Sequence, residues 1–360
     1  MLKNSKDNNI TKKRKKTWVD QLLKWYKINK RNLPWRKKNN QNFYSIWISE
    51  IMLQQTQVKT VIPYFERFKE KWPYLKKFKS ATLNDILLIW KGLGYYQRAH
   101  NIYKTLQILK KKQINPLYVN LIKLPGIGEY TAASISAILK NDGMAVVDGN
   151  IKRILSRVCN IKENEKNFLR KIKNHAQCLT PNDNRSDYCQ SLMDLGATIC
   201  LPKNQKCQTC PVDSFCDFNL KKRKPVKKLK KTKSLKFGIA FIVKYKKKFF
   251  IVKSKEKLLE NMFGFPTSDF FLISTINNFN LFKKETIKSW IKTNSLSSSY
   301  EEVFTLKHNF SGFDLKLLIV KIESNKDKII TNPGLWIEKD KFKEFPFSKL
   351  MSKITNEVIY

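Results

Sequence analysis

The sequence predicts a multidomain protein in which an all-α region is followed by a smaller α+β domain. Its 360 residues are enough for two or three domains with cores of their own. Up to about residue 218 the apolar residues recur at helical spacing, whereas beyond Phe237 they alternate as in strands. Between these segments, residues 221–236 begin with a lysine-rich run and are predicted to form a basic linker.

The first element expected is a helix that begins at Thr17, a residue type that caps helices, and carries Trp18 and Leu22 on its apolar face. Residues 1–16 are polar and basic, so we expect a disordered arm there. Within residues 17–220, glycine and proline separate further predicted helices, which cover 45–56, 58–70, 81–89, 97–110, 132–139, 151–158 and 189–195.

Residues 237–360 are predicted to form the α+β domain. Two short apolar segments, 237–243 and 249–252, flank lysine-rich turn residues and indicate a hairpin. Residues 314–321 are a further strand candidate.

Four cysteines with the spacing C-x6-C-x2-C-x5-C close the all-α region: Cys200, Cys207, Cys210 and Cys216. Thiols so close together, in a chain without a secretory signal, indicate a metal site rather than disulfides. Soft sulfur ligands suit both zinc and iron–sulfur clusters. The uneven spacing lacks the paired arrangement of structural zinc sites, so it favours a [4Fe–4S] cluster in the loop 200–216.

The formal net charge of +42 at pH 7 indicates a polyanionic partner such as nucleic acid. Lysine is abundant throughout the chain, however, and a compositional bias would explain the same charge. No apolar run approaches the eighteen residues that a membrane-spanning helix needs, and the N-terminus has no apolar signal segment. We therefore expect a cytoplasmic protein with no membrane partner.

A glycine turn opens directly into a helix at residues 124–133, with Gly126 and Gly128 in the turn. Glycine lets the backbone approach a phosphate closely, and a helix N-terminus offers free N–H groups. An ordinary turn between two helices would have the same G-x-G pattern. Followed by the Val-Asp-Gly-Asn turn at 147–150, the pattern is typical of a helix-hairpin-helix.

The hairpin, the Val-Asp-Gly-Asn turn and the four cysteines, in this order, resemble the endonuclease III superfamily of helix-hairpin-helix DNA glycosylases. Three further segments are similar to MutY-type adenine DNA glycosylases: WISEIMLQQTQV at 47–58, VIPYFERF at 61–68 and GLGYY at 92–96. The resemblance is dense through residue 218 and thinner beyond Phe237. It implies a monomeric enzyme of base excision repair that acts on double-stranded DNA.

Tyr130 distinguishes this chain within the superfamily. Glycosylase/lyases of this fold have a lysine at that hairpin position, and its amine forms a Schiff base with the sugar, which tyrosine cannot do. The resemblance therefore implies a monofunctional glycosylase whose acid is Glu50 of the SEIMLQQ segment.

Cleavage of an N-glycosidic bond builds positive charge on the sugar while electrons move into the base, so the site needs an acid and an anion. Glu50, on an apolar helix face, is expected to have a raised pKa and to protonate adenine N7. Asp148 is expected to stay ionised, to stabilise or trap the sugar cation, and also to cap the following helix. A solvated carboxylate at Glu50 and a plain helix cap at Asp148 are the alternatives. By resemblance, Tyr130 and Asn150 assist.

An adenine inside a duplex must be flipped out before its glycosidic bond can be cut. By resemblance, Gln55 and Tyr95 wedge into the base stack beside the lesion. Arg36 and Gln190 match positions around the adenine pocket.

Residues 237–360 resemble the MutT-like, Nudix-fold domain with which MutY-type proteins recognise 8-oxoguanine opposite the adenine, through segments 261–266 and 306–311. The family has Phe-Ser-His where this chain has Phe310-Ser311-Gly312. Ser311 is thus expected to hydrogen-bond the lesion, while the histidine is missing. The Nudix hydrolase motif is absent from this segment, which argues against a nucleotide pyrophosphatase.

The sequence therefore predicts a glycosylase that removes adenine opposite 8-oxoguanine, and opposite G, and that holds a [4Fe–4S] cluster. Two alternatives stay open. One is an endonuclease III-like pyrimidine glycosylase/lyase, against which Tyr130 argues. The other is a non-catalytic iron–sulfur protein that only binds DNA, against which the presence of Glu50, Asp148 and all four cysteines argues.

Overall fold

The computed structural model describes residues 12–218, 233–254, 262–296, 299–310, 312–327, 329 and 333–358. The chain divides into two compact units, Met1–Ser80 with Lys104–Val226 and Ala81–Tyr103 with Lys227–Tyr360. Residues 81–103, which we expected in the all-α region, group with the second unit in this division. The predicted domain boundaries therefore stay predictions.

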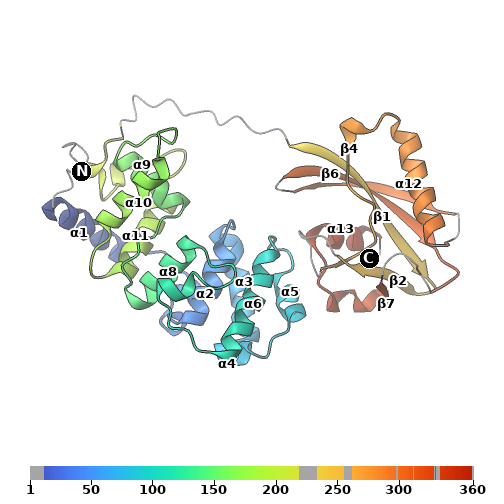
Figure 1. Ribbon diagram of the computed structural model, residues 1–360, viewed down its shortest axis with the longest axis horizontal. Coiled ribbons are helices and arrows are strands. Elements are labelled where there is room, and N and C mark those ends of the chain that lie inside the picture. The colour runs from blue at the N-terminus through green and yellow to red at the C-terminus, as the bar shows by residue number, and fades with distance from the viewer. Residues whose placement is uncertain are drawn as a thin grey trace. The chain divides into compact units, whose positions relative to one another are not determined.

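The first unit is built from helices, as predicted (Figure 1). Its α-helices are α1 Lys12–Asn29, α2 Phe43–Leu53, α3 Val58–Lys71, α4 Leu75–Phe78, α7 Tyr118–Leu121, α8 Glu129–Lys140, α9 Gly149–Val158, α10 Phe168–Leu179 and α11 Arg185–Thr198. Helix α5, Leu83–Trp90, belongs to the second unit, and α6, Gln97–Lys111, runs from one unit into the other. Short 3₁₀ turns include η1 Pro34–Arg36, η3 Cys207–Thr209 and η4 Asp213–Phe215.

All seven of the later helices that we predicted are present, with ends shifted by a few residues. The first helix begins at Lys12 rather than at Thr17, so the expectation of a disordered arm is wrong for residues 12–16. Lysine and arginine are good helix formers, and the Lys15 ammonium donates to the Thr180 carbonyl at 2.8 Å. Residues 1–11 lie outside the described residues. Helix α10 was missed, although its apolar residues recur at helical spacing.

Helix α11 lies at the centre of one core of the first unit, in contact with α1, α8 and α9. Trp18 of α1 is buried there, and its indole N–H donates to the Tyr188 hydroxyl at 3.2 Å. Helix α2 packs against α8, and residues of α2 such as Trp47 and Ile51 are buried. The helices α2, α8, α9 and α11 carry Glu50, Tyr130, Asn150 and Gln190 respectively, and Asp148 directly precedes α9.

The second unit is a mixed sheet with strand order β3-β2-β1-β6-β5, in which β4 also pairs with β1 and β7 with β2. The strands are β1 Ser234–Tyr245, β2 Lys248–Lys253, β3 Phe263–Gly264, β4 Phe271–Leu272, β5 Glu301–Asn309, β6 Phe313–Glu323 and β7 Gly334–Glu338. Strands β1 and β2 form the predicted hairpin, with Lys246 at a φ of 52° in its turn. The predicted linker is wrong in its last residues, because Ser234 already pairs with Phe313 of β6.

Helices cover both faces of this sheet (Figure 1). Successive residues of a strand point to opposite faces. Phe237, Ile239 and Phe241 of β1 thus pack with α12, Phe279–Thr293. Ala240 and Ile242 pack in the other core, which includes residues of α13, Lys349–Val358. The α+β class predicted for this part of the chain is confirmed.

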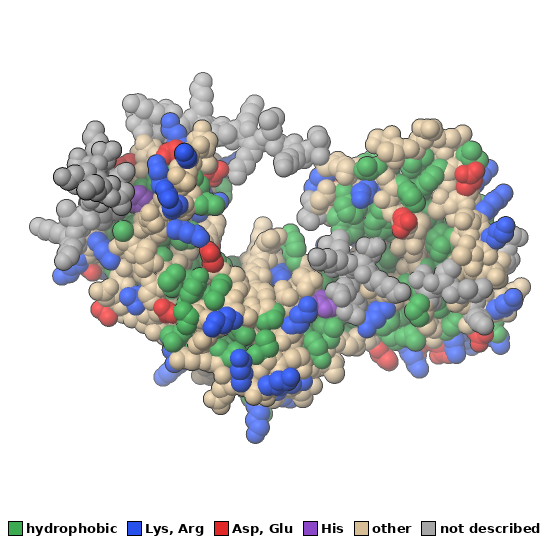
Figure 2. Space-filling view, viewed as in Figure 1, with side chains coloured by type: hydrophobic (Ala, Val, Ile, Leu, Met, Phe, Trp, Pro, Cys, Tyr) green, Lys and Arg blue, Asp and Glu red, His purple; other side chains and the backbone are tan. Residues whose placement is uncertain are grey.

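Lysine and arginine side chains are spread over the face of each unit seen in Figure 2 and are not gathered there into one patch. In the part of the chain that the structure describes, no helix has the length and apolarity needed to cross a bilayer.

Candidate active site

Glu50 lies in helix α2, which is apolar and buried around most of its circumference. The helix begins after Asn42, whose side chain accepts a hydrogen bond from the Ser45 N–H at 3.0 Å and so caps it. Only 5% of Glu50 is exposed. The hydroxyl groups of Tyr130 and Ser134, both on α8, lie close enough to its carboxylate to lower its pKa. The alternative of a solvated carboxylate at Glu50 is therefore wrong.

Burial raises the pKa of Glu50 from its ordinary value to about 7. The hydroxyl groups of Tyr130 and Ser134 act on the carboxylate in the opposite direction, Asp148 raises the pKa further, and Arg36 lowers it. Because desolvation is the largest of these effects, the carboxyl is protonated to a substantial extent at neutral pH. This confirms the raised pKa that the apolar helix face predicted.

Asp148 is the N-cap of helix α9. Its carboxylate accepts a hydrogen bond from the Ile151 N–H at 2.6 Å and another from the Asn150 amide at 3.1 Å. Burial raises the pKa of Asp148, while these hydrogen bonds and the charge of Arg153 oppose the rise. The capping role predicted for Asp148 is confirmed. Its ionised state and its part in catalysis stay predictions.

Asn150 is held from two sides. Its Oδ1 atom accepts a hydrogen bond from the Arg153 guanidinium at 2.9 Å, and Arg153 also donates to the carbonyls of Gly196 and Cys200, at 2.7 and 2.9 Å. Gly196 of α11 leaves the necessary room, since a Cβ atom at this position would lie 2.6 Å from the Asn150 Cβ. Helix α11 and the start of the cysteine loop thus fix the amide that hydrogen-bonds Asp148.

Arg36 ends the 3₁₀ turn η1, and its guanidinium forms a two-point ion pair with Asp194 of α11, at 2.7 and 2.9 Å. It also lies 5.7 Å from the ring centre of Tyr26. We predicted Arg36 as a pocket residue but missed Asp194. The signal available was a carboxylate within the apolar stretch Leu192–Gly196, four residues after Gln190.

Gln190 and Gln55 do not join this hydrogen-bonded group. The Gln190 amide donates to the carbonyl and hydroxyl oxygens of Ser186, one turn earlier in α11. Gln55 is exposed in the turn after α2 and has a φ of 57°, a conformation that is uncommon for a residue with a side chain and is often found at functional sites. Their predicted contacts with DNA and adenine stay predictions.

The hairpin before α8 adopts the predicted turn. Gly126 has a φ of 76°, which glycine adopts without strain, and Gly128 is the N-cap of α8. Gln54, at the end of α2, donates to the Gly126 carbonyl at 3.1 Å and to the Thr131 hydroxyl at 3.2 Å. The hairpin and the Glu50 helix are therefore joined directly.

Two predicted DNA-binding residues belong to the second unit. Tyr95 has 43% of its surface exposed and a φ of 50°, and the Arg98 guanidinium lies 5.3 Å from its ring centre. Tyr96 is buried, in keeping with a core role. Ser311 lies outside the described residues. Gly312 follows it, and a Cβ atom there would meet no other atom within 4 Å.

The four cysteines of loop 200–216 are half-buried and form no disulfide. Cys207 begins η3, Cys210 follows it, and Cys216 follows η4. Arg157 donates to the Cys200 sulfur at 3.2 Å and to the carbonyls of Leu201 and Pro202. In the described chain, no three His, Cys, Asp or Glu side chains are gathered closely enough to hold a single metal ion. The predicted cluster stays a prediction.

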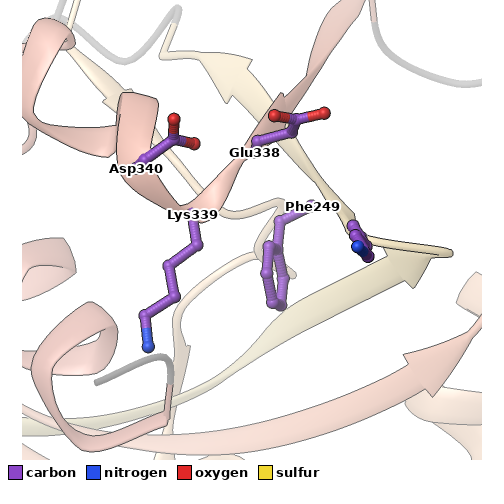
Figure 3. A pocket seen from close by; sticks show the side chains of 5 residues that line it. Phe249, Glu338, Lys339 and Asp340 are labelled. Atoms are coloured by element: carbon purple, nitrogen blue, oxygen red, sulfur yellow. The ribbon is translucent and has the colours of Figure 1, made fainter.

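A cavity of about 540 Å³ lies in the second unit, and none of the predicted site residues line it. It lies where β2 meets β7 and is open to solvent. In Figure 3, Phe249 and Lys339 extend to one side and the carboxylates of Glu338 and Asp340 to the other. This cavity holds no set of groups with an obvious chemistry, so we place the active site at Glu50 instead.

The arrangement around Glu50 supplies the two groups that N-glycosidic cleavage requires. A buried carboxyl titrates near neutrality, and a second carboxylate lies close enough to affect it. The hairpin next to them carries Tyr130 where a lyase of this fold has lysine. A buried carboxyl with a raised pKa, a second carboxylate and a glycine turn at a helix N-terminus thus belong to one helical unit.

Comparison with known proteins agrees with this geometry. Residues 48–178 match the family model of the HhH-GPD superfamily base excision DNA repair proteins. The adenine DNA glycosylase of Buchnera aphidicola subsp. Schizaphis graminum is 36% identical over 348 residues, 92% of this chain and 96% of that protein. The human adenine DNA glycosylase is 38% identical over 211 residues, 54% of this chain and 38% of that protein. A solved thermostable thymine-DNA glycosylase is similar with a TM-score of 0.52 and 26% identity, over 58% of this chain and 98% of that one.

The fold and these matches define a helix-hairpin-helix DNA glycosylase, an enzyme of base excision DNA repair that hydrolyses N-glycosyl bonds. Within this class the chain belongs to the adenine DNA glycosylase family. The resemblance on which the sequence prediction rested is confirmed.

Proposed function

We propose that the protein removes adenine opposite 8-oxoguanine, and opposite G, from double-stranded DNA without cutting the strand. The observation that carries the proposal is the buried Glu50 carboxyl, with a pKa of about 7, beside Tyr130 and Asp148. A carboxyl that is partly protonated at neutral pH can donate a proton to a leaving base. A tyrosine at position 130 forms no Schiff base, so the site lacks the group that a lyase needs.

In the proposed mechanism, Glu50 donates its proton to N7 of the flipped adenine. The bond between the base and C1′ then breaks, and its electron pair goes to the base. The Asp148 carboxylate stabilises the positive charge that develops on the sugar, and Asn150 keeps it in place through the hydrogen bond at 3.1 Å. The ionised Glu50 takes a proton from the attacking water, whose oxygen bonds C1′, and this restores the acid.

The proposal includes a [4Fe–4S] cluster held by Cys200, Cys207, Cys210 and Cys216. The chemistry of the donor set fits, because these are four soft thiols that form no disulfide, and the Arg157 guanidinium donates to the Cys200 sulfur at 3.2 Å. When bound, the cluster supplies four metal–sulfur bonds that fix the loop 200–216. The residues of the chain do the base chemistry.

We also propose that the second unit recognises 8-oxoguanine, in the manner of the MutT-like domains that it resembles in sequence. The likeness to the Buchnera relative extends over 92% of this chain and so includes part of that unit. Gly312 stands where the family has a histidine. We therefore propose that recognition of 8-oxoguanine depends on Ser311 and has no contribution from a histidine side chain.

The test uses purified protein and duplexes that hold A opposite 8-oxoguanine, A opposite G or A opposite T. Strand scission only after alkali, at the adenine and only in the two mispairs, is the expected result. Scission without alkali, together with a covalent adduct trapped by borohydride, would show a lyase. Absence of scission with all three duplexes would leave a protein that only binds DNA.

A further inference from the structure

Asp194 is a carboxylate with an unusually complete set of partners. It is fully buried on α11, and each of its oxygens accepts two hydrogen bonds. Oδ1 accepts from Arg31 Nε at 2.6 Å and from Arg36 Nη2 at 2.9 Å. Oδ2 accepts from the Arg31 backbone N–H at 3.0 Å and from Arg36 Nη1 at 2.7 Å. One anion thus holds two guanidinium groups against α11.

The Arg36 guanidinium has a second carboxylate nearby. Arg36 acts electrostatically on the Glu50 carboxylate, and the other groups that lower the pKa of Glu50 are the neutral hydroxyls of Tyr130 and Ser134. A guanidinium fits a carboxylate with two parallel hydrogen bonds, so an Arg36 released from Asp194 has a ready acceptor in Glu50. That pairing favours the ionised form of Glu50, which cannot protonate a base.

We propose that Asp194 is a positioning residue for base removal, which binds the guanidinium groups of Arg31 and Arg36 and so keeps Arg36 from pairing with the Glu50 carboxylate. This inference rests on the proposed function, because it concerns the proton that Glu50 delivers. Asp194 contacts neither the substrate nor the sugar in this account, and acts only through Arg36.

The groups that surround Glu50 leave Arg36 as the decisive charge. The polar and titratable groups that interact with Glu50 come from four elements. They are Arg36 of η1, Tyr130 and Ser134 of α8, Asp148 at the start of α9 and Cys189 of α11. Arg36 is the cation of this set, so its distance from Glu50 decides how strongly the ionised form is stabilised.

The test compares wild type with Asp194→Asn, which keeps the shape of the side chain but removes its charge. Single-turnover rates with saturating enzyme are measured on an A:G duplex from pH 5 to 9. The proposal predicts that the alkaline fall in rate moves to lower pH by about one unit, a loss of about tenfold at pH 8 with little loss at pH 5.5. A rate that is lowered at every pH, with the alkaline fall centred at the same pH as in wild type, would overturn the proposal. It would indicate that Asp194 has a structural role instead.

Glu165→Gln is the matched control. It removes a carboxylate from an exposed ion pair with Lys171 and is expected to leave the pH profile unchanged. If Asp194→Asn does not fold, Arg36→Lys replaces it, because lysine keeps the charge but cannot make the two-point contact with Asp194. This variant is expected to move the fall in rate in the same direction, and an unchanged position would overturn the proposal.

A second measurement does not depend on activity. The pKa of Glu50 is followed by carbon NMR of protein labelled in its glutamate carboxyl groups, with Glu50→Gln to identify the signal. The proposal predicts a lower pKa of Glu50 in Asp194→Asn than in wild type, and equal values would overturn it. A lower pKa in a protein that removes no adenine would contradict the proposed function alone.

Discussion

The helices around Glu50 and the sheet domain of residues 233–358 differ in how they place charged side chains. The helices of the first unit bury the carboxylates of Glu50 and Asp194 and half-bury that of Asp148, at a cost that specific partners offset. Among the described residues 233–358, by contrast, no acidic or basic side chain is buried. Ion pairs there lie at the surface, as between Lys283 and Glu302. In the proposed function the first unit does the chemistry and the second recognises 8-oxoguanine.

The largest effect is expected from Glu50→Gln. The amide cannot donate or accept the catalytic proton, so the single-turnover rate on A:G and A:8-oxoguanine duplexes should fall by about 10²- to 10⁴-fold. Binding to the same duplexes, measured by fluorescence anisotropy, should be retained. If the variant kept the wild-type rate, Glu50 would not be the catalytic acid, and the assignment of the chemistry to the first unit would be wrong.

The same substitution should stabilise the protein at high pH. Burial raises the pKa of Glu50 from 4.5 to about 7, so the ionised form destabilises the folded state as pH rises through this interval. Above pH 7 the wild type carries a cost on the order of 3 kcal/mol that the amide avoids. The melting-temperature gap between Glu50→Gln and wild type should therefore be larger at pH 8 than at pH 5. A gap independent of pH would contradict the raised pKa.

Gly196→Ala tests how firmly the first unit positions its second carboxylate. The added Cβ atom would lie 2.6 Å from the Asn150 Cβ, so Asn150 must shift and weaken its hydrogen bond to Asp148. We expect a rate loss of about ten- to a hundredfold on both mispairs. Gly312→Ala is the matched control, since its Cβ atom meets nothing within 4 Å and the A:G rate should not change.

The smallest effect is expected from Gly312→His in the second unit. Position 312 has room for a side chain, and the new donor can add one hydrogen bond to the lesion, worth roughly 3- to 10-fold in preference. The ratio of rates for A:8-oxoguanine over A:G should rise by this factor, while the A:G rate stays the same. A change in the A:G rate would show that the second unit also affects the chemistry.

Much of the first unit could be predicted because its chemistry depends on residues close together in sequence. The acid helix, the hairpin and the cap at Asp148 each occupy one continuous segment with a recognisable pattern. Asp194 could not be assigned in this way, because its partners Arg31 and Arg36 lie about 160 residues away and meet it only in the folded core. The need for glycine at position 196 could not be predicted either, because Asn150 approaches it only where α9 packs on α11.

The second unit was less predictable for a related reason. The hairpin of β1 and β2 is local and was predicted, but β1 pairs over most of its length with β6, a parallel partner distant in sequence. Strands β5 and β7 and helices α12 and α13 were not predicted, since their short or irregular apolar patterns become clear only against the sheet. The start of α1 at Lys12 was missed because a basic segment can be helical as well as disordered.

The most direct test of this account is the pH dependence of adenine release by the wild-type enzyme. Single-turnover rates on an A:G duplex are measured from pH 5 to 9, with strand scission developed by alkali after the reaction is stopped. If Glu50 delivers the proton, the rate falls about tenfold per pH unit above about pH 7, where the carboxyl loses its proton. A rate that is constant or rises between pH 7 and 9 would contradict the assignment of Glu50 as the acid.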